Sequence, residues 1–161
     1  MATHDAVIDW TRPEQTSDAD FLAGHYSRGH TIEFDEGVTL PGSASPSVVK
    51  KPWSIDAAAD PEELLVAATA TCHMLWFLDF AKRAGFPVRR YRDNPTGVMG
   101  KMEDGSIGIT RIYLHPEVSF GGAPPSHPAL EALHHEAHGA CNIANSIRSE
   151  VIVESSEPRP I

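Results

Sequence analysis

The chain has few cysteines and few basic residues, and both shortages limit what it can be. Its two cysteines, in a reducing compartment, are more often reduced, catalytic or inert than joined in a permanent bridge. The 13 Lys and Arg residues are outnumbered by 22 Asp and Glu, which gives a formal net charge of −9. No long run of Lys or Arg offsets this acidity, so we expect neither a nucleic acid nor an anionic membrane as a partner.

The sequence also lacks the marks of export and of membrane insertion. Its first 20 residues are polar, are interrupted by Pro13 and carry no secretory n-region, which is typical of a loose arm over residues 1–22. The most hydrophobic run, from Leu64 to Leu78, spans only about 15 residues, short of the ~20 that cross a bilayer. We therefore expect a soluble, cytoplasmic protein.

The remaining length corresponds to about one domain, which we place at residues 23–156, with a short tail at 157–161. A chain of this size has enough interior for a core without disulfide staples. Near its start, β-prone residues in partial alternation surround Asp35-Glu36-Gly37, which predicts a hairpin.

A long helix is predicted between Asp60 and Gly85. Asp60 suits the N-cap, Pro61 suits the first helical position, and Glu63 completes a capping box. Gly85 and a following proline end the helix. Because this helix is apolar nearly all round, it has to be covered on all sides.

Strands and a second helix follow. Residues 88–120 predict antiparallel strands joined at Asp104-Gly105, with a bulge near Thr110. A second helix is predicted from about Pro128 to Ile143, and a final strand near residues 146–155. The apolar stripe of the second helix consists of Leu130, Leu133, Ala137, Cys141 and Ala144.

This order of elements predicts an α+β fold rather than alternating βαβ units. One sheet and one further helix do not suffice to cover the long helix in so small a chain. We therefore expect a homodimer in which the partner helps to wrap it.

The two cysteines each lie on an apolar helix face, Cys72 in the long helix and Cys141 in the second. A buried cysteine is by default a small hydrophobe, so the position of Cys72 alone favours a packing role. The pair could nevertheless meet within disulfide range, because the two helices have to pack together. A reactive thiolate there would need a nearby cation or hydrogen-bond donor. Arg28 and the adjacent His73 are candidates, but adjacent helical residues diverge by about 100°, so His73 cannot easily face the same side as the sulfur.

Two sequence blocks resemble one family. "DPEELLVAATATCH" is similar to the first cysteine helix of the OsmC/Ohr family of thiol peroxidases, in which the cysteine follows the helix-start Glu by ten residues. "EAHGACNIANSIRSEVIV" resembles that family's second cysteine helix and terminal strand. The resemblance extends from about Tyr26 to Glu154. It implies an OsmC-like fold: antiparallel sheets around a long buried central helix, a second helix that carries a cysteine, and an intertwined homodimer.

The resemblance also implies roles. Cys72 corresponds to the peroxidatic cysteine, which attacks a hydroperoxide and becomes a sulfenic acid. Cys141 corresponds to the resolving cysteine, whose disulfide with Cys72 is reduced by an external dithiol, lipoyl-type in the family. Glu62 matches the helix-start Glu that orients an activating Arg. Arg28 is the better candidate for that Arg, since before the long helix the chain offers only Lys50 and Lys51.

Because Glu62 and Cys72 lie ~15 Å apart on one helix, we expect Arg28 and Glu62 of one chain to serve Cys72 and Cys141 of the other. Such a site lies between the subunits of a homodimer. The resemblance implies no cofactor. The chain departs from the hydroperoxide branch at His73 and Asn142, where that branch often has an aromatic residue and a proline, so we expect a differently shaped pocket around the sulfur.

Two other functions stay open. His134, His138 and Cys141 are spaced at i, i+4 and i+7, so they share a helix face and could hold Zn²⁺ or a related transition metal. Alternatively, the fold has kept an apolar pocket for a small ligand and has lost turnover.

Overall fold

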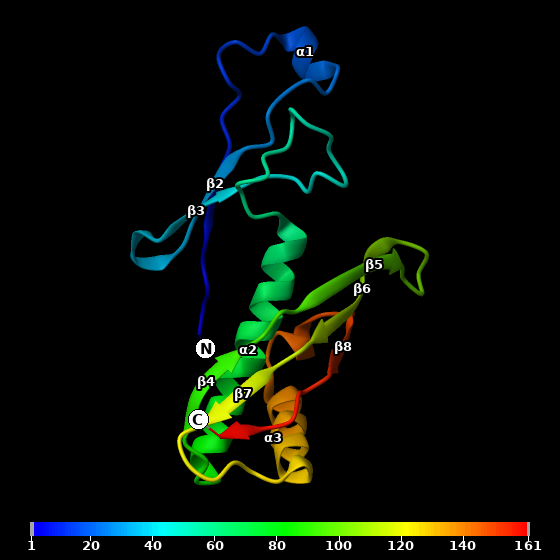
Figure 1. Ribbon diagram of the computed structural model, residues 1–161. Helices are drawn as coiled ribbons and strands as arrows, with labels where there is room; N and C mark the ends of the chain where they lie inside the picture. Colours follow the sequence, from blue (N-terminus) through cyan, green and yellow to red (C-terminus); the bar gives the residue numbers. More distant parts are fainter. Residues whose placement is uncertain (1, 161) are drawn as a thin grey trace. The chain divides into compact units, whose positions relative to one another are not determined.

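The computed structural model describes residues 2–160 (Figure 1). The chain forms two compact units, one ending at Leu64 and the other beginning at Leu65. This boundary lies inside the region predicted as a single domain. It also falls within one helix, so that a single element begins in the first unit and continues in the second.

The first unit contains a three-stranded antiparallel sheet, ordered β1-β2-β3 (Figure 1). Its strands are β1 (Val7–Asp9), β2 (His30–Glu33) and β3 (Thr39–Gly42). The predicted hairpin is confirmed: β2 and β3 are joined through the 3-10 turn η1 (Asp35–Gly37). Gly37 has φ +76° there, a conformation that favours glycine.

Residues 7–22 are more ordered than the loose arm that we expected. β1 pairs with β2, and the short helix α1 (Asp18–Leu22) is capped by Ser17 through a complete capping box. The reason is an aromatic cluster: the Phe21 ring lies 4.6 Å from Tyr26 and 6.1 Å from Trp10. Trp10 Nε1 also donates a hydrogen bond to the Ser27 carbonyl at 2.9 Å.

Helix α2 (Pro61–Arg83) confirms the predicted long helix and both of its ends. The Glu63 amide donates to Asp60 Oδ1 at 2.7 Å, and the Asp60 amide donates to Glu63 Oε2 at 3.2 Å, which is the reciprocal capping box. Gly85, with φ +80°, follows the last turn.

The second unit carries two more three-stranded sheets, ordered β4-β7-β9 and β5-β6-β8. β4 pairs with β7 and β5 with β6 in antiparallel fashion, whereas β6 with β8 and β7 with β9 are parallel. The predicted bulge is confirmed, because Val98 faces Arg111 and Met99 faces Ile109, which leaves Thr110 as the extra residue. The strands are β4 (Val88–Arg92), β5 (Thr96–Lys101), β6 (Ile107–Leu114), β7 (Glu117–Phe120), β8 (Glu150–Val153) and β9 (Arg159–Pro160).

Helix α3 (His127–Ala140) is shorter than predicted. Cys141 is its C-cap, with φ −68° and ψ 107°, so the expectation of a helix running to Ile143 is wrong. The backbone turns because nearby groups satisfy the last carbonyls: the Asn145 side-chain amide donates to the Gly139 carbonyl at 3.1 Å. A 3-10 turn, η2 (Ala144–Ser146), leads on to β8.

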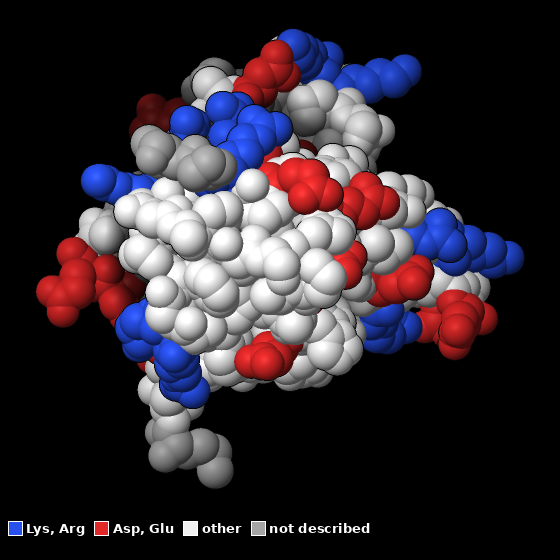
Figure 2. Space-filling view, turned by 60° about the horizontal axis from the view of Figure 1, so that its bottom comes forward, with Lys and Arg blue, Asp and Glu red and all other residues white. Residues whose placement is uncertain are grey.

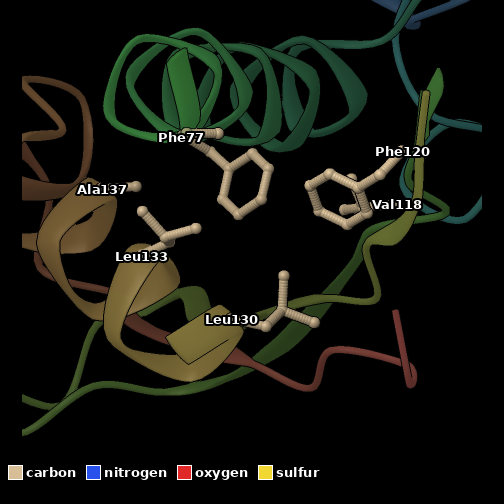
Figure 3. Packing of buried hydrophobic residues seen from close by; sticks show 7 residues of the cluster. Phe77, Val118, Phe120, Leu130, Leu133 and Ala137 are labelled. Carbon is tan, nitrogen blue, oxygen red and sulfur yellow. The ribbon is translucent and has the colours of Figure 1, made fainter. Parts of the chain in front are cut away.

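One apolar cluster joins α2, α3 and β7 (Figure 3). The Phe77 ring points from α2 into the space between the α3 side chains and Phe120 (Figure 3). The fully buried members of this cluster include Phe77, Phe120, Leu130 and Ala137. A second cluster, of Ala70, Ile109, Ile112 and Leu114, lies between α2 and β6.

Helix α2 is only partly covered within a single chain. It is long and apolar enough to cross a membrane by composition, but only 33% of its most apolar stretch is buried. Leu75, near its middle, is 58% exposed. Figure 2 shows a face of the molecule with a broad uncharged area bordered by charged side chains of both signs. The middle of α2 therefore leaves apolar side chains exposed within the described chain.

Candidate active site: two thiols and a buried histidine pair

Cys72 is placed by the rigid middle of α2. It is half-buried, between the buried residues Thr69 and His73 on one side and the exposed Thr71 and Leu75 on the other. Because the capping box and Gly85 fix both ends of the helix, the position of the Cys72 thiol is set by the helix itself.

Cys141 lies against the turn of α2 that precedes Cys72. Its sulfur is 4.0 Å from the carbonyl oxygen of Thr69, to which the thiol can donate. The Ala144 amide donates to the sulfur at 3.4 Å. The side chain is buried, with 1% of its surface exposed. Both cysteines are free thiols.

The surroundings of Cys141 favour a protonated thiol. Burial raises the pKa of Cys141, the Ala144 N–H opposes this, and the neighbouring Cys72 thiol raises the pKa further by hydrogen bonding and charge. The Cys141 sulfur thus lies beside the turn of α2 that precedes Cys72. Because the thiolate is the nucleophile in disulfide chemistry, a protonated Cys141 is the less reactive form.

A buried histidine pair links the two helices beside the thiols. His73 Nε2 and His134 Nδ1 are 3.1 Å apart and the rings are stacked, with an interplanar angle of 9°. The residues are 1% and 3% exposed. Burial is the main cause that lowers the pKa of His73 to about 4 and that of His134 to about 3. Both rings are therefore neutral at pH 7, so one nitrogen donates and the other accepts.

The contact between His73 and His134 was not predicted from the sequence. The signal for it lay in the spacing of Thr69, His73 and Phe77, which repeats every four residues and forms the buried stripe of α2. His134 was considered only as a metal ligand, whereas in the structure it stacks on the Phe77 ring at 4.3 Å and contacts His73.

Arg28 and Glu62 both belong to the first unit, whereas Cys72 and Cys141 belong to the second. Arg28 precedes β2, and its Nη1 donates to the carbonyls of Gly24 at 2.8 Å and Tyr26 at 2.6 Å. Its guanidinium carbon lies 3.7 Å from the centre of the Tyr26 ring. Glu62 lies half-buried in the first turn of α2 and has no ion pair among residues 2–160. Their catalytic roles stay predictions.

The predicted metal ligands do not form a ready-made site. Cys141 turns away from the helical spacing at the C-cap, and His134 is bonded to His73. Across residues 2–160, no three His, Cys, Asp or Glu side chains are placed to hold a metal ion. His134 and His138 instead line a cavity of about 390 Å³ together with His127, Glu131, His135 and Glu154.

A smaller pocket, of about 260 Å³, lies against the exposed side of α2. Thr71 and Met74, which flank Cys72 and His73 in the sequence, line it, and Tyr91 and Asp93 close its far side. The Tyr91 hydroxyl and Asp93 Oδ2 have no hydrogen-bond partner among the described residues, and burial raises the pKa of Asp93. Phe77 belongs to the core, and Trp76 packs against it.

Comparison with known proteins matches this arrangement to one family. A family model described as OsmC-like protein matches residues 55–156. The fold is that of an OsmC-like protein of unknown function from Vibrio cholerae, at 43% identity and a TM-score of 0.93, covering 97% of this chain and 100% of that one. Among curated proteins, none is significantly similar.

More distant structures share the fold. An organic hydroperoxide resistance protein from Elizabethkingia anophelis is 18% identical, with a TM-score of 0.67, over 100% of this chain and 98% of that one. The organic hydroperoxide resistance protein OhrB of Bacillus subtilis is 17% identical, with a TM-score of 0.58, over 98% of each chain.

Proposed function

Because the chain belongs to the OsmC-like family, we propose that it is a cytoplasmic, thiol-dependent peroxidase that reduces organic hydroperoxides. The observation that carries this proposal is the placement of two free thiols where α2 and α3 pack together: Cys72 is half-buried on a rigid helix, and the buried Cys141 sulfur lies 4.0 Å from the Thr69 carbonyl of that helix.

The proposed reaction has two steps in the protein. The Cys72 thiolate attacks the outer oxygen of ROOH, the O–O bond breaks, and with one proton the products are Cys72 sulfenic acid and ROH. The Cys141 thiolate then attacks the Cys72 sulfur, and hydroxide leaves with a proton as water. An external dithiol, of the lipoyl type, reduces the disulfide and is itself oxidised to a disulfide.

Solved structures with this fold include organic hydroperoxide resistance proteins, which supports an organic substrate over H₂O₂. The pocket lined by Thr71 and Met74 does not include Cys72, so it carries no argument about the substrate.

Thiol titration tests the reaction directly. One equivalent of tert-butyl hydroperoxide is expected to remove both thiols of the reduced protein and to give one Cys72–Cys141 disulfide by mass spectrometry. Cys72→Ser is expected to leave Cys141 unreacted, and Cys141→Ser to trap the sulfenic acid at Cys72. Thiols that survive the peroxide indicate a ligand-binding protein, and stoichiometric metal in the purified protein indicates a metal site; either result refutes the peroxidase.

The proposed catalyst is a homodimer. The uncovered apolar face of α2 supports a second copy as the covering surface. In this arrangement Arg28 of one subunit activates Cys72 of the other, and Glu62 orients the guanidinium. Sedimentation at several concentrations tests the dimer, and a concentration-independent monomer mass would refute it.

Mixed dimers test the sharing of the site. Arg28→Ala and Cys72→Ser subunits are each inactive alone. A shared site predicts recovery of about a quarter of the wild-type rate after random exchange, because half of the dimers are mixed and each of these has one complete site of two. No recovery in verified mixed dimers would place Arg28 and Cys72 in the same subunit or remove Arg28 from the mechanism.

A further inference from the structure

The histidine pair and the thiol pair lie along one seam between α2 and α3. On α2, Thr69 and His73 are four residues apart and share the buried stripe. Thr69 meets Cys141, since its carbonyl lies 4.0 Å from the sulfur, and His73 meets His134 at 3.1 Å. The His73–His134 contact is therefore one turn along α2 from the contact between Thr69 and Cys141.

The rest of this seam is apolar. Phe77 of α2 packs against Leu133 and Ala137 of α3 (Figure 3). Apolar contacts are non-directional. A hydrogen bond weakens steeply when its distance or angle changes, so the His73–His134 bond adds what the apolar contacts lack, a fixed register.

The register of α3 on α2 affects whether Cys72 and Cys141 can form a disulfide, because a disulfide allows only a narrow range of geometries. Cα atoms joined by a disulfide are usually 4.4–6.8 Å apart. A shift of one residue along a helix moves a side chain by about 1.5 Å along the axis and turns it by about 100°. Such a shift of α3 against α2 would carry Cys141 out of reach of Cys72.

We propose that His73 and His134 are positioning residues: their buried hydrogen bond fixes the register of α3 on α2 in which the Cys72 and Cys141 sulfurs meet. This inference rests on the proposed function only for its catalytic consequence, the resolution of the sulfenic acid. It concerns the thiol pair itself, so it can be tested without peroxide.

The test measures how readily the disulfide forms from glutathione disulfide: the two protein thiols are oxidised to the disulfide, and one glutathione disulfide is reduced to two glutathiones. The variants are His73→Phe, His134→Phe and the double variant, which keep a ring in the stack but cannot form the bond. We expect the equilibrium constant to fall about 10-fold or more in all three, which is about 30 mV in reduction potential.

The double variant separates positioning from stability. One nitrogen of each ring, His73 Nδ1 and His134 Nε2, already lacks a partner among the described residues. Each single variant leaves the remaining imidazole with both nitrogens unpaired, which destabilises the fold, whereas the double variant removes both polar groups and recovers stability. If the pair acts only through stability, the double variant will return to the wild-type equilibrium constant, and that result overturns the proposal. If the pair fixes the register, the constant stays low in a stable protein.

Two further variants serve as controls. His73→Gln carries an amide that can still bond to His134, so we expect its equilibrium constant to stay within about 3-fold of wild type. His135→Ala changes an exposed neighbour on α3 and is expected to have no effect. A loss in His135→Ala as large as that in His73→Phe would also overturn the proposal. Lack of peroxidase activity in wild type would refute the proposed function but leave this result unchanged.

Discussion

Acidification should weaken the fold through the two buried imidazoles. In the folded protein the pKa of His73 is about 4 and that of His134 about 3, against an ordinary value of 6.5. Below pH 6.5 the unfolded chain therefore binds protons that the folded chain does not bind, so the free energy of unfolding falls as the pH falls. The loss stops only near pH 3 to 4, where the folded protein is protonated too.

The magnitude at pH 5 depends little on how far the folded pKa values are lowered. At that pH the unfolded imidazoles are 1.5 pH units below their ordinary pKa of 6.5. At 1.36 kcal/mol per unit, each histidine costs about 2 kcal/mol of stability relative to pH 8, and the pair about 4 kcal/mol.

Guanidinium chloride unfolding at pH 8 and pH 5 measures this loss, with the protein concentration held fixed because association would shift the midpoint. The His73→Phe/His134→Phe variant retains every other titrating group, so the difference between its pH loss and that of wild type isolates the pair. We expect a difference of about 4 kcal/mol, and His135→Ala should lose as much as wild type. Equal losses in wild type and the double variant would show that the rings take up protons in the folded state near their ordinary pKa.

Three other outcomes are expected. Phe77→Ala should cost about 3–5 kcal/mol in the free energy of unfolding, because its fully buried ring fills the cluster between α2 and α3; an unfolding loss under 1 kcal/mol would contradict that packing. Met74→Ala should change kcat/KM for tert-butyl hydroperoxide and for H₂O₂ by the same factor, because the pocket that Met74 lines does not include Cys72; a larger loss for tert-butyl hydroperoxide would place the substrate in that pocket. Metal analysis of the purified protein should find less than stoichiometric Zn²⁺, and His134→Ala should leave that content unchanged.

The sequence predicted best what local chemistry determines. The ends of α2 were predictable because Asp60, Glu63 and Gly85 each act within a few residues of their position. The bulge at Thr110 was predictable because the apolar alternation of one strand slips there. The proximity of Cys72 and Cys141 followed only from the requirement that two apolar helix faces pack together.

What depends on distant partners could not be predicted in the same way. The end of α3 at Ala140 depends on the Asn145 side chain, which caps it from the following loop. The His73–His134 bond joins residues 61 positions apart, and nothing local indicates that a histidine on an apolar stripe has found another as its partner. The order in residues 7–22 likewise needs Tyr26 and Ser27, which lie outside that segment.

Because Cys141 is the C-cap of α3, its sulfur can be moved by a backbone change that the sulfur of Cys72, in the middle of α2, does not allow. Cys72 is held by helical hydrogen bonds on both sides along α2, whereas Cys141 lies at the end of α3, where turn hydrogen bonds replace the helical ones: its amide donates to the His138 carbonyl at 3.2 Å, and the Asn145 amide donates to its carbonyl at 3.0 Å. When the two sulfurs approach to form a disulfide, we expect residues 141–146 to move while both helices keep their hydrogen bonds. Amide exchange on oxidation should accordingly change around residues 141–146 and leave the middle of α2 protected.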